Sequence, residues 1–189
     1  MKLSFYYVDQ GHIEYLKEKE IEYRGFTTVP NLKYASKTKF VYGVVMQIGE
    51  LNYFVPVTSY NRSKEDNIVI KVTEHKRMKL VGSLRFNYMI PVPGFCLTPV
   101  NFKDTSFSEE YKILLDKEYR YLKKNVGIGT IQKQAKKTYE KVLGGTDLQL
   151  IKNSCAFQLL ERACLEYIDN HLPARDMNRE VEKWLNKKK

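Results

Sequence analysis

The stretch FVYGVVMQIGELNYFVPVTS (residues 40–59) holds two runs rich in β-branched and aromatic residues, separated by Gly49 and Glu50. Two such runs on either side of a short glycine-containing turn are typical of a β-hairpin. We therefore expect one strand at residues 40–48 and a second at residues 51–57. This hairpin is the strongest local structural signal in the chain, and it favours an antiparallel sheet.

Further strand patterns lie on both sides of the hairpin. Short apolar runs at residues 3–8, 67–72 and 80–90 predict three more strands, and Gly82 predicts a bend in the last of them. A polar connection at residues 22–39 separates the first strand region from the hairpin. This connection is long for a compact domain, and loops of such length are often functional.

Helical spacing follows the first strand and dominates the C-terminal half. Asp9 is a predicted N-cap for a helix whose apolar side includes Ile21. Later helices are expected to begin at Ser106, as part of a capping box, and at Ser154, and another is expected to end at Gly144. Strands followed by helices predict an α+β fold with segregated layers.

The length of the chain limits how it can be divided. A chain of 189 residues is long enough to bury a core and fits one domain with a short appendage. The charged residues after Pro173 set the end of the chain apart. We therefore expect one domain at residues 1–172 and a charged, helical extension at residues 173–189.

The charge of the chain points to a polyanionic partner. Thirty-two Lys and Arg residues against 22 Asp and Glu residues give a net charge of +10, which favours nucleic acid. The chain also has 14 tyrosines, which either stack on unpaired bases or pack in the core. Since there is neither a long apolar run nor a secretory start, we expect a cytoplasmic protein without a membrane segment.

The residues that most often carry catalysis or bind metal form no recognisable motif. The cysteines are odd in number and widely spaced, so we expect buried free thiols at Cys96, Cys155 and Cys164. The histidines form no ligand pair, so we expect surface or capping positions for His12, His75 and His171. The carboxylates form no cluster suited to two metal ions. The sequence therefore predicts neither a metal site nor a cofactor.

The second strand of the hairpin ends in hydroxyls and cations. Thr58 and Ser59 are followed within five residues by Arg62 and Lys64. Either these hydroxyls only turn the chain, or they face a phosphate with the cations supplying charge. The second alternative suits attack of an RNA 2′-hydroxyl on its own adjacent phosphate, because the nucleophile is already tethered and the protein mainly aligns it and stabilises the oxyanion.

Four stretches, in this order, carry a resemblance to a known family. They are FYYVDQGHIEYLKE (residues 5–18), GVVMQIGELNYFVPVTS (43–59), SLRFNYMIPV (83–92) and NSCAFQLLERACLEYI (153–168). Together they resemble the ToxN/AbiQ-like toxins of type III toxin–antitoxin systems. The resemblance implies a compact, strongly curved antiparallel sheet flanked by helices, similar to the MazF/Kid-type toxins.

The resemblance also implies functional residues. Thr58 and Ser59 match the active-site hydroxyls of the family, and Lys39 matches a basic residue that contacts RNA on the loop before the hairpin. The same loop implies RNA contacts from Lys33, Tyr34 and Lys37, with Tyr34 one residue out of step with the family spacing.

The chain departs from the family pattern directly after the two hydroxyls. The family usually has Thr-Ser-Pro-Lys, whereas this chain has Tyr60 and Asn61 after Ser59. The family lysine is thus absent at Asn61, and either Arg62 or Lys64 takes its place in the catalytic set. Tyr60 and Asn61 are then expected to contact RNA.

The activity implied by the resemblance is a sequence-specific, metal-independent endoribonuclease that leaves 2′,3′-cyclic phosphate and 5′-hydroxyl ends. The implied partners are a cognate repeat RNA antitoxin that inhibits the toxin in a closed assembly of several copies of each, and a cellular or phage RNA substrate. The alternative is a non-catalytic RNA-binding module that uses the same basic loops. A DNA-binding protein is disfavoured because no helix pair has the pattern of a helix-turn-helix.

Overall fold

The computed structural model describes residues 4–34, 37–74, 77–104 and 106–171, with the backbone alone at residues 33, 34, 37 and 38. The expected extension at residues 173–189 and the expected position of His75 fall outside the described residues. Within these residues the chain forms β1 and α1 first, then the strands β2 to β9, and then the helices α2 to α5.

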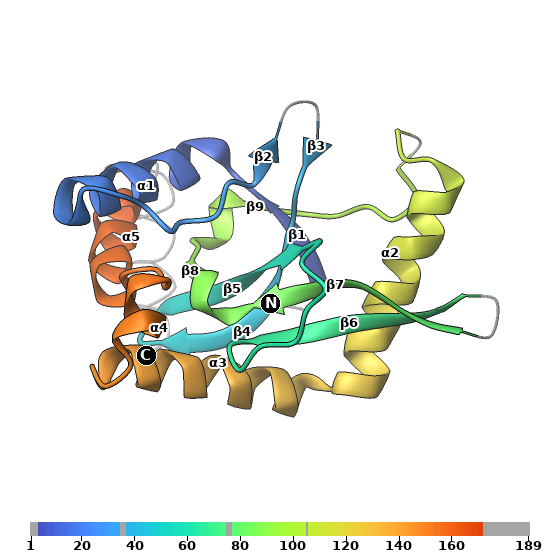
Figure 1. Ribbon diagram of the computed structural model, residues 1–189. Coiled ribbons are helices and arrows are strands. Elements are labelled where there is room, and N and C mark those ends of the chain that lie inside the picture. Colours follow the sequence, from blue (N-terminus) through green and yellow to red (C-terminus); the bar gives the residue numbers. More distant parts are fainter. Residues whose placement is uncertain (1–3, 35–36, 75–76, 105, 172–189) are drawn as a thin grey trace, which may run out of the picture.

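The hairpin forms the centre of an antiparallel sheet (Figure 1). Strands β4 (Val41–Ile48) and β5 (Leu51–Thr58) pair with Gly43 opposite Phe54. The seven-stranded sheet runs in the order β6-β7-β5-β4-β1-β9, and β8 pairs with β5 beside this path. The remaining strands of the sheet are β1 (Ser4–Val8), β6 (Asn67–Glu74), β7 (Arg77–Arg85), β8 (Ile90–Pro91) and β9 (Leu97–Pro99). The predicted hairpin is confirmed, and the predicted strand at residues 80–90 is divided by a 3-10 turn at Phe86–Tyr88.

Helices surround the sheet. Figure 1 shows α1 and α5 together at one end, α2 at the other end, and α3 along the lower side. The α1 helix packs on α5, α2 on β6, and α3 on β4. Their bounds are α1 (Gln10–Arg24), α2 (Glu109–Tyr121), α3 (Ile128–Leu143), the short α4 (Leu148–Lys152) and α5 (Phe157–His171), with a π-helical turn at Leu122–Val126. An antiparallel sheet with helices mostly in the C-terminal half is the predicted α+β fold.

Two predicted helix starts are wrong. Ser108, not Ser106, is the N-cap of α2, with its Oγ accepting from the backbone N–H of Tyr111 at 3.3 Å. The backbone N–H of Ser106 is instead used in a turn, where it donates to Asp104. Ser154 does not open α5, because its Oγ donates to the carbonyl of Leu150 at 2.6 Å and so closes α4.

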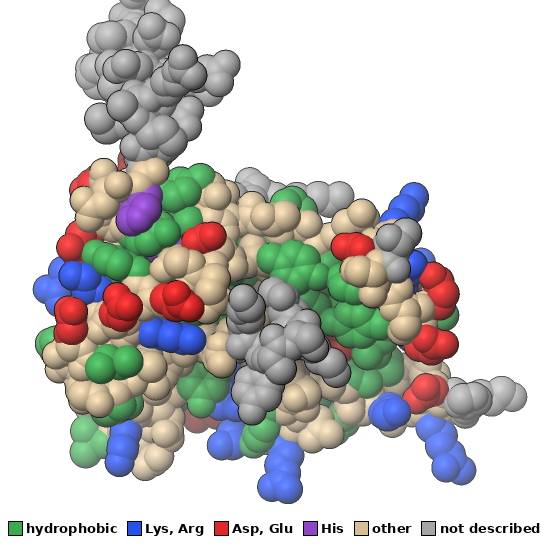
Figure 2. Space-filling view, turned by 90° about the horizontal axis from the view of Figure 1, so that it is seen from above, with side chains coloured by type: hydrophobic (Ala, Val, Ile, Leu, Met, Phe, Trp, Pro, Cys, Tyr) green, Lys and Arg blue, Asp and Glu red, His purple; other side chains and the backbone are tan. Residues whose placement is uncertain are grey.

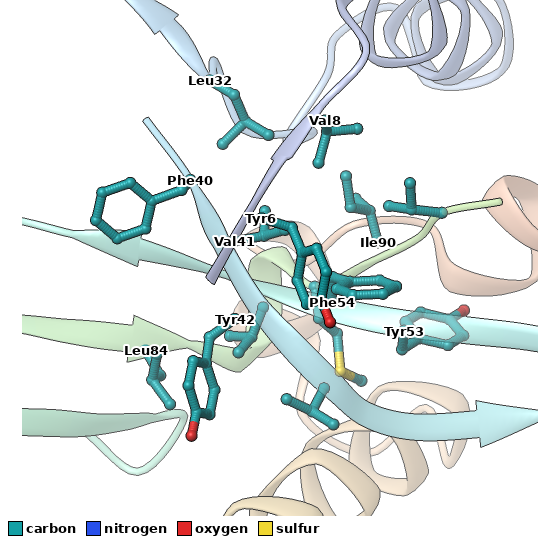
Figure 3. Close-up of a cluster of buried hydrophobic side chains, with 14 of the residues drawn as sticks. Tyr6, Val8, Leu32, Phe40, Val41, Tyr42, Tyr53, Phe54, Leu84 and Ile90 are labelled. Atoms are coloured by element: carbon teal, nitrogen blue, oxygen red, sulfur yellow. The ribbon is translucent and has the colours of Figure 1, made fainter. Parts of the chain in front are cut away.

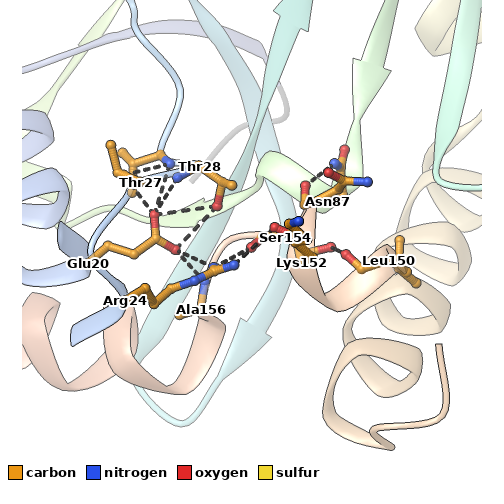
Figure 4. A network of polar contacts seen from close by, with 11 residues as sticks. Glu20, Arg24, Thr27, Thr28, Asn87, Leu150, Lys152, Ser154 and Ala156 are labelled. Carbon is orange, nitrogen blue, oxygen red and sulfur yellow. Dashed lines mark hydrogen bonds and ion pairs between the residues drawn. The ribbon is translucent and has the colours of Figure 1, made fainter. Parts of the chain in front are cut away.

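A buried carboxylate holds the end formed by α1 and α5 together. Glu20 has no exposed surface and accepts from the backbone N–H groups of Thr28 and Ala156, at 2.6 and 2.7 Å (Figure 4). It also pairs with Arg24, whose guanidinium donates to the carbonyl of Ser154 at 2.7 Å. Ile21, which was expected to face inward, is instead 46% exposed. The hydrogen bonds and the ion pair of Glu20 thus favour a rotation of α1 that buries Glu20 and exposes Ile21.

The core is aromatic. Phe5 has no exposed surface and packs against Phe40 and Tyr42, with ring centroids 4.8 and 5.2 Å apart. Figure 3 shows Tyr42, Tyr53 and Phe54 gathered around the central strands. Several tyrosines are therefore core residues, and the tyrosine count alone does not indicate base stacking.

The three predicted free thiols are confirmed. Cys96, Cys155 and Cys164 are all buried and unpaired by disulfides. Burial raises the pKa of the Cys96 and Cys164 thiols to about 12, and it raises the pKa of Cys155 as well. The thiolate is the reactive form of cysteine. These side chains therefore act as small apolar residues.

The surface or capping position expected for His12 is wrong. His12 has no exposed surface, and its Nε2 lies 3.0 Å from the carbonyl oxygen of Pro91. Burial lowers the pKa of His12, so the ring is neutral at pH 7. This contact joins α1 to β8, which gives the side chain a structural role.

Glu118 makes the stability of the fold depend on pH. Its side chain on α2 is only 7% exposed, and burial raises the pKa of its carboxyl from 4.5 to about 7. A raised pKa means that the folded state binds the proton more tightly than the unfolded state. Stability is therefore lost as the pH rises from about 4.5 to about 7. Glu118→Gln mimics the protonated form and should raise the free energy of unfolding by about 3 kcal/mol at pH 8.

Urea denaturation of both proteins at several pH values measures this effect. The difference between Glu118→Gln and the wild type should shrink toward zero as the pH falls to about 4.5. Asp116→Asn, on the same helix but at a half-exposed ion pair with Arg120, is the matched control and should change stability little at any pH. A constant difference across this pH range would contradict the assignment.

Candidate functional site

The end of β5 and the loop that follows it bring the two predicted hydroxyls to the edge of the sheet. Thr58 pairs with Ser83 of β7, and its Oγ1 lies 3.4 Å from the Oγ of Ser83 and 3.4 Å from the backbone N of Tyr60. Ser83 is fully buried, whereas Ser59 is exposed. Thr58 is thus anchored in the sheet, and Ser59 presents its hydroxyl to solvent.

Gly82 lets β7 pass close behind Thr58. A side chain added at Gly82 would bring its Cβ within 2.4 Å of the Thr58 carbonyl oxygen, and backbone cannot move away as a flexible side chain can. The pairing of β6 with β7 also shifts beside this glycine, between Ile70 and Lys71. The predicted bend near Gly82 is therefore present, and it positions the end of β5.

A cation that the sequence patterns did not single out lies beside the loop. The Arg85 guanidinium stands over the rings of Tyr60 and Tyr88, at 4.8 and 4.7 Å from their centroids, and pairs with Asp66 at 3.8 Å. Tyr60, expected as an RNA contact, is half-buried under this guanidinium, and the Lys64 Nζ lies 5.7 Å from the same ring. Arg85 is the single charged residue in the predicted strand at residues 80–90, and this was the signal that could have identified it.

The polar loop has a fixed backbone. Asn67, at the start of β6, accepts from the Lys64 backbone N–H at 2.9 Å and donates to the Arg62 carbonyl at 2.8 Å. The side chains of Asn61, Arg62 and Lys64 are exposed. The edge formed by residues 58–64 is called the β5–β6 loop here. Its cations face solvent, and its backbone is held by the two bonds to Asn67.

The expected RNA-binding loop reaches the same edge. Its short strands β2 (Lys33–Tyr34) and β3 (Lys37–Thr38) pair antiparallel, and the side chains of Lys33, Tyr34 and Lys37 lie outside the described residues. Lys39 is exposed, and its backbone N–H donates to Leu32 at 2.6 Å. Val41 pairs with Pro56, and the Val57 N–H donates to the Phe40 carbonyl. Lys39, the residue before Phe40, therefore lies near the end of β5.

Charged side chains of both signs lie on the surface. Figure 2 shows Asp and Glu side chains at both ends of the molecule, the end formed by α1 and α5 and the end of α2, with Lys and Arg side chains projecting mainly from the rim. Among the residues that the structure describes, no three His, Cys, Asp or Glu side chains are close enough together to hold a metal ion. No helix in the described part of the chain is long and apolar enough to cross a membrane.

The order of these elements matches one protein family. A profile described as "Toxin ToxN, type III toxin-antitoxin system" matches residues 4–165, which is most of the chain. The chain belongs to the ToxN family of toxins. The match includes β1, the hairpin with its Thr58–Ser59 end, and most of α5.

Curated relatives of the ToxN family align with most of the chain. Endoribonuclease ToxN of Bacillus thuringiensis subsp. kurstaki is 27% identical over 187 residues, covering 95% of this chain and 89% of that protein. Endoribonuclease AbiQ of Lactococcus lactis subsp. lactis is 26% identical over 177 residues, covering 88% of this chain and 90% of that protein. The prediction of an endoribonuclease of this family is therefore confirmed.

Solved structures of ToxN-family toxins share the fold. One comes from a type III toxin–antitoxin system whose toxin is inhibited by a non-coding RNA pseudoknot; it has a TM-score of 0.71, is 27% identical and covers 88% of this chain and 98% of its own. The structure of AbiQ, described as a lactococcal anti-phage endoribonuclease, has a TM-score of 0.70, is 26% identical and covers 89% and 99%. The α+β architecture is thus that of the ToxN-family toxins.

Proposed function

We propose that this toxin cleaves RNA at the β5–β6 loop without a metal ion, leaving a 2′,3′-cyclic phosphate and a 5′-hydroxyl. The 2′-oxygen of the RNA forms a bond to the adjacent phosphorus, and the bond from phosphorus to the 5′-oxygen breaks. The 2′-hydroxyl loses its proton, and the departing 5′-oxygen gains one. Because the nucleophile is tethered to the phosphate, alignment and charge stabilisation supply most of the catalysis.

The observation that carries this proposal is the rigid strand end that presents the exposed Ser59 beside the anchored Thr58. In our assignment the Ser59 hydroxyl donates to a non-bridging oxygen of the scissile phosphate, while Thr58 fixes the turn. Lys39, near the end of β5, and the cations of the loop offset the charge that grows in the transition state.

Lys64 is the cation that we assign in place of the family lysine absent at Asn61. Its Nζ lies near the ring of Tyr60, the residue directly after Ser59. Arg62 is exposed on the same loop, and we assign it to neighbouring phosphates of the RNA. Since a phosphate contact depends on geometry, Lys64→Ala should slow cleavage far more than Arg62→Ala.

Analysis of product ends tests the reaction. We expect purified toxin to cleave RNA in the presence of EDTA and to leave ends that resist ligation until the cyclic phosphate is removed. Products with 3′-hydroxyl ends, or cleavage only after Mg²⁺ is added, would refute the mechanism. RNA binding with no cleavage under any of these conditions would instead identify a non-catalytic RNA-binding module.

We also propose that a cognate repeat RNA inhibits this toxin, in a closed assembly with several copies of each. The inhibition of a related toxin by an RNA pseudoknot supports this partner. The free toxin would act on cellular or phage RNA in the cytoplasm. We assign the activity to residues 1–172, of which residues 4–165 match the family.

Binding of the antitoxin RNA should depend steeply on salt. If four cations, Lys33, Lys37, Lys39 and Lys64, each contact one phosphate, a plot of log affinity against log salt should have a slope of about −3. Titrations of the toxin with the repeat RNA at several salt concentrations measure this slope. Lys39→Ala should make it shallower by about one phosphate contact. A flat plot would mean that the charge is only a solvated surface.

A further inference from the structure

A pocket of about 540 Å³, lined mainly by polar and charged residues, opens beside the β5–β6 loop. Lys64 and Arg85 line it on the side of the candidate site, and the helices α3 and α4 line it on the other. Gln134 of α3 donates to the carbonyl of Glu65 at 2.6 Å and so joins the helix to the loop. The pocket therefore shares the Lys64 side chain with the residues assigned to cleavage.

Two side chains that line this pocket each have a buried polar atom without a hydrogen-bond partner among the described residues. These atoms are the Nε of Arg85, a donor, and the Oδ1 of Asn87, an acceptor. Asn87 is 99% buried, and its amide is held in place because Nδ2 donates to the Asn153 carbonyl at 2.6 Å. A buried donor or acceptor without a partner is costly, so a ligand that pairs with these atoms gains from doing so.

The charges that line the pocket nearly cancel. Four cations, Lys64, Arg85, Lys137 and Lys141, face three carboxylates, those of Glu65, Asp66 and Asp147. The Glu65 carboxylate pairs with both Lys137 and Lys141. A cluster of phosphates would need more unpaired positive charge. The lining suits a neutral polar group with at most one phosphate.

An aromatic ring adds a stacking surface. Tyr88 is half-buried and lines the pocket, and the Arg85 guanidinium packs on its ring. Unpaired nucleobases stack on tyrosine rings and on arginine guanidinium planes. Every base also presents donors and acceptors at its edge, which the Arg85 and Asn87 atoms lack.

We propose that this pocket holds one nucleobase of the RNA strand beside the scissile phosphate, and thereby sets the base preference of the toxin at that position. The proposal rests on the cleavage site assigned above, because Lys64 belongs to both. Tyr88 supplies the stacking surface, and Asn87 and Arg85 read the edge of the base.

Binding of single nucleotides tests the pocket apart from catalysis. Titration calorimetry of the Ser59→Ala toxin with each of the four 3′-mononucleotides should show binding that favours one base, with inorganic phosphate much weaker. Tyr88→Ala should weaken this binding about 10-fold, whereas Tyr88→Phe, which keeps the ring, should retain it. Equal binding of phosphate and nucleotides, or of all four bases, would overturn the proposal.

A second measurement requires no substitution at Tyr88. In the wild-type protein, the favoured mononucleotide should shift the NMR signals of the side-chain amides of Gln134, Gln149 and Asn153, which line the pocket. Octamers of 2′-O-methyl RNA containing the same base should displace it. A nucleotide that binds but is not displaced by RNA would mark a site for free nucleotides, against the proposal. If RNA is not cleaved but the nucleotide still shifts the amide signals, the proposed reaction is refuted, whereas the proposed base pocket is supported.

Discussion

Ser59→Ala should lower the rate of RNA cleavage by at least about 100-fold while leaving the fold and the affinity for RNA intact. The reason is that Ser59 is the exposed hydroxyl at the rigid end of β5, and a single positioned donor to an oxyanion contributes about 10²–10³ in rate. Single-turnover cleavage of a labelled RNA, together with the melting temperature of each variant, measures the effect.

Ser63→Ala is the matched control for Ser59→Ala. Ser63 is also exposed, lies in the same loop and carries the same hydroxyl, but it has no place in the proposed site. It should cleave RNA at nearly the wild-type rate. Equal rates for Ser59→Ala and Ser63→Ala would mean that the hydroxyls at the end of β5 only turn the chain.

Glu20→Ala should lower the free energy of unfolding by about 3–5 kcal/mol, because it removes the fully buried carboxylate that pairs with Arg24. It also leaves the backbone N–H groups of Thr28 and Ala156 without their acceptor (Figure 4). These groups lie on the segment that leads to β2 and at the start of α5. The loss should therefore lower the global stability of the fold.

Urea denaturation compares Glu20→Ala with Glu18→Ala, an exposed glutamate on the same helix. Glu18→Ala should change stability by no more than about 0.5 kcal/mol. If the two variants unfold at the same urea concentration, the Glu20 network does not hold the end formed by α1 and α5. A loss in Glu20→Ala that Glu20→Gln restores fully would show that shape matters there and charge does not.

The sheet could be predicted from the sequence because its signals are local. The hairpin around Gly49 and the bend at Gly82 depend on neighbouring residues, and both are present. The helix starts at Ser106 and Ser154 were wrong because each residue uses its groups in another local bond. Periodicity thus predicted the type of these elements correctly, but not the residues at which α2 and α5 begin.

Residues whose partners are distant in sequence could not be predicted from pattern. Glu20 is buried because it meets the N–H of Ala156, 136 residues away, and Asn87 is fixed by Asn153, 66 residues away. Periodicity alone would place a glutamate outside and an isoleucine inside, which is the reverse of Glu20 and Ile21. Only the assembled fold shows these polar partners.

The candidate site was predicted in part. The family resemblance identified Thr58 and Ser59, and the pairing of β4 with β5 brings Lys39 near the end of β5. Arg85 and Asn67 escaped notice because their roles come from packing on the loop: Arg85 stacks on Tyr60, and Asn67 bonds the backbone of Arg62 and Lys64. No spacing in the sequence reports such contacts.

The most direct test of the cleavage site is a structure of the toxin bound to an RNA that carries a 2′-deoxy nucleotide at the cut, which removes the nucleophile. The proposed mechanism predicts a non-bridging oxygen of the scissile phosphate at about 2.5–3.0 Å from the Ser59 Oγ, with the Lys64 Nζ on the same phosphate. A scissile phosphate that lies away from both Thr58 and Ser59, with the RNA bound on another face, would contradict it.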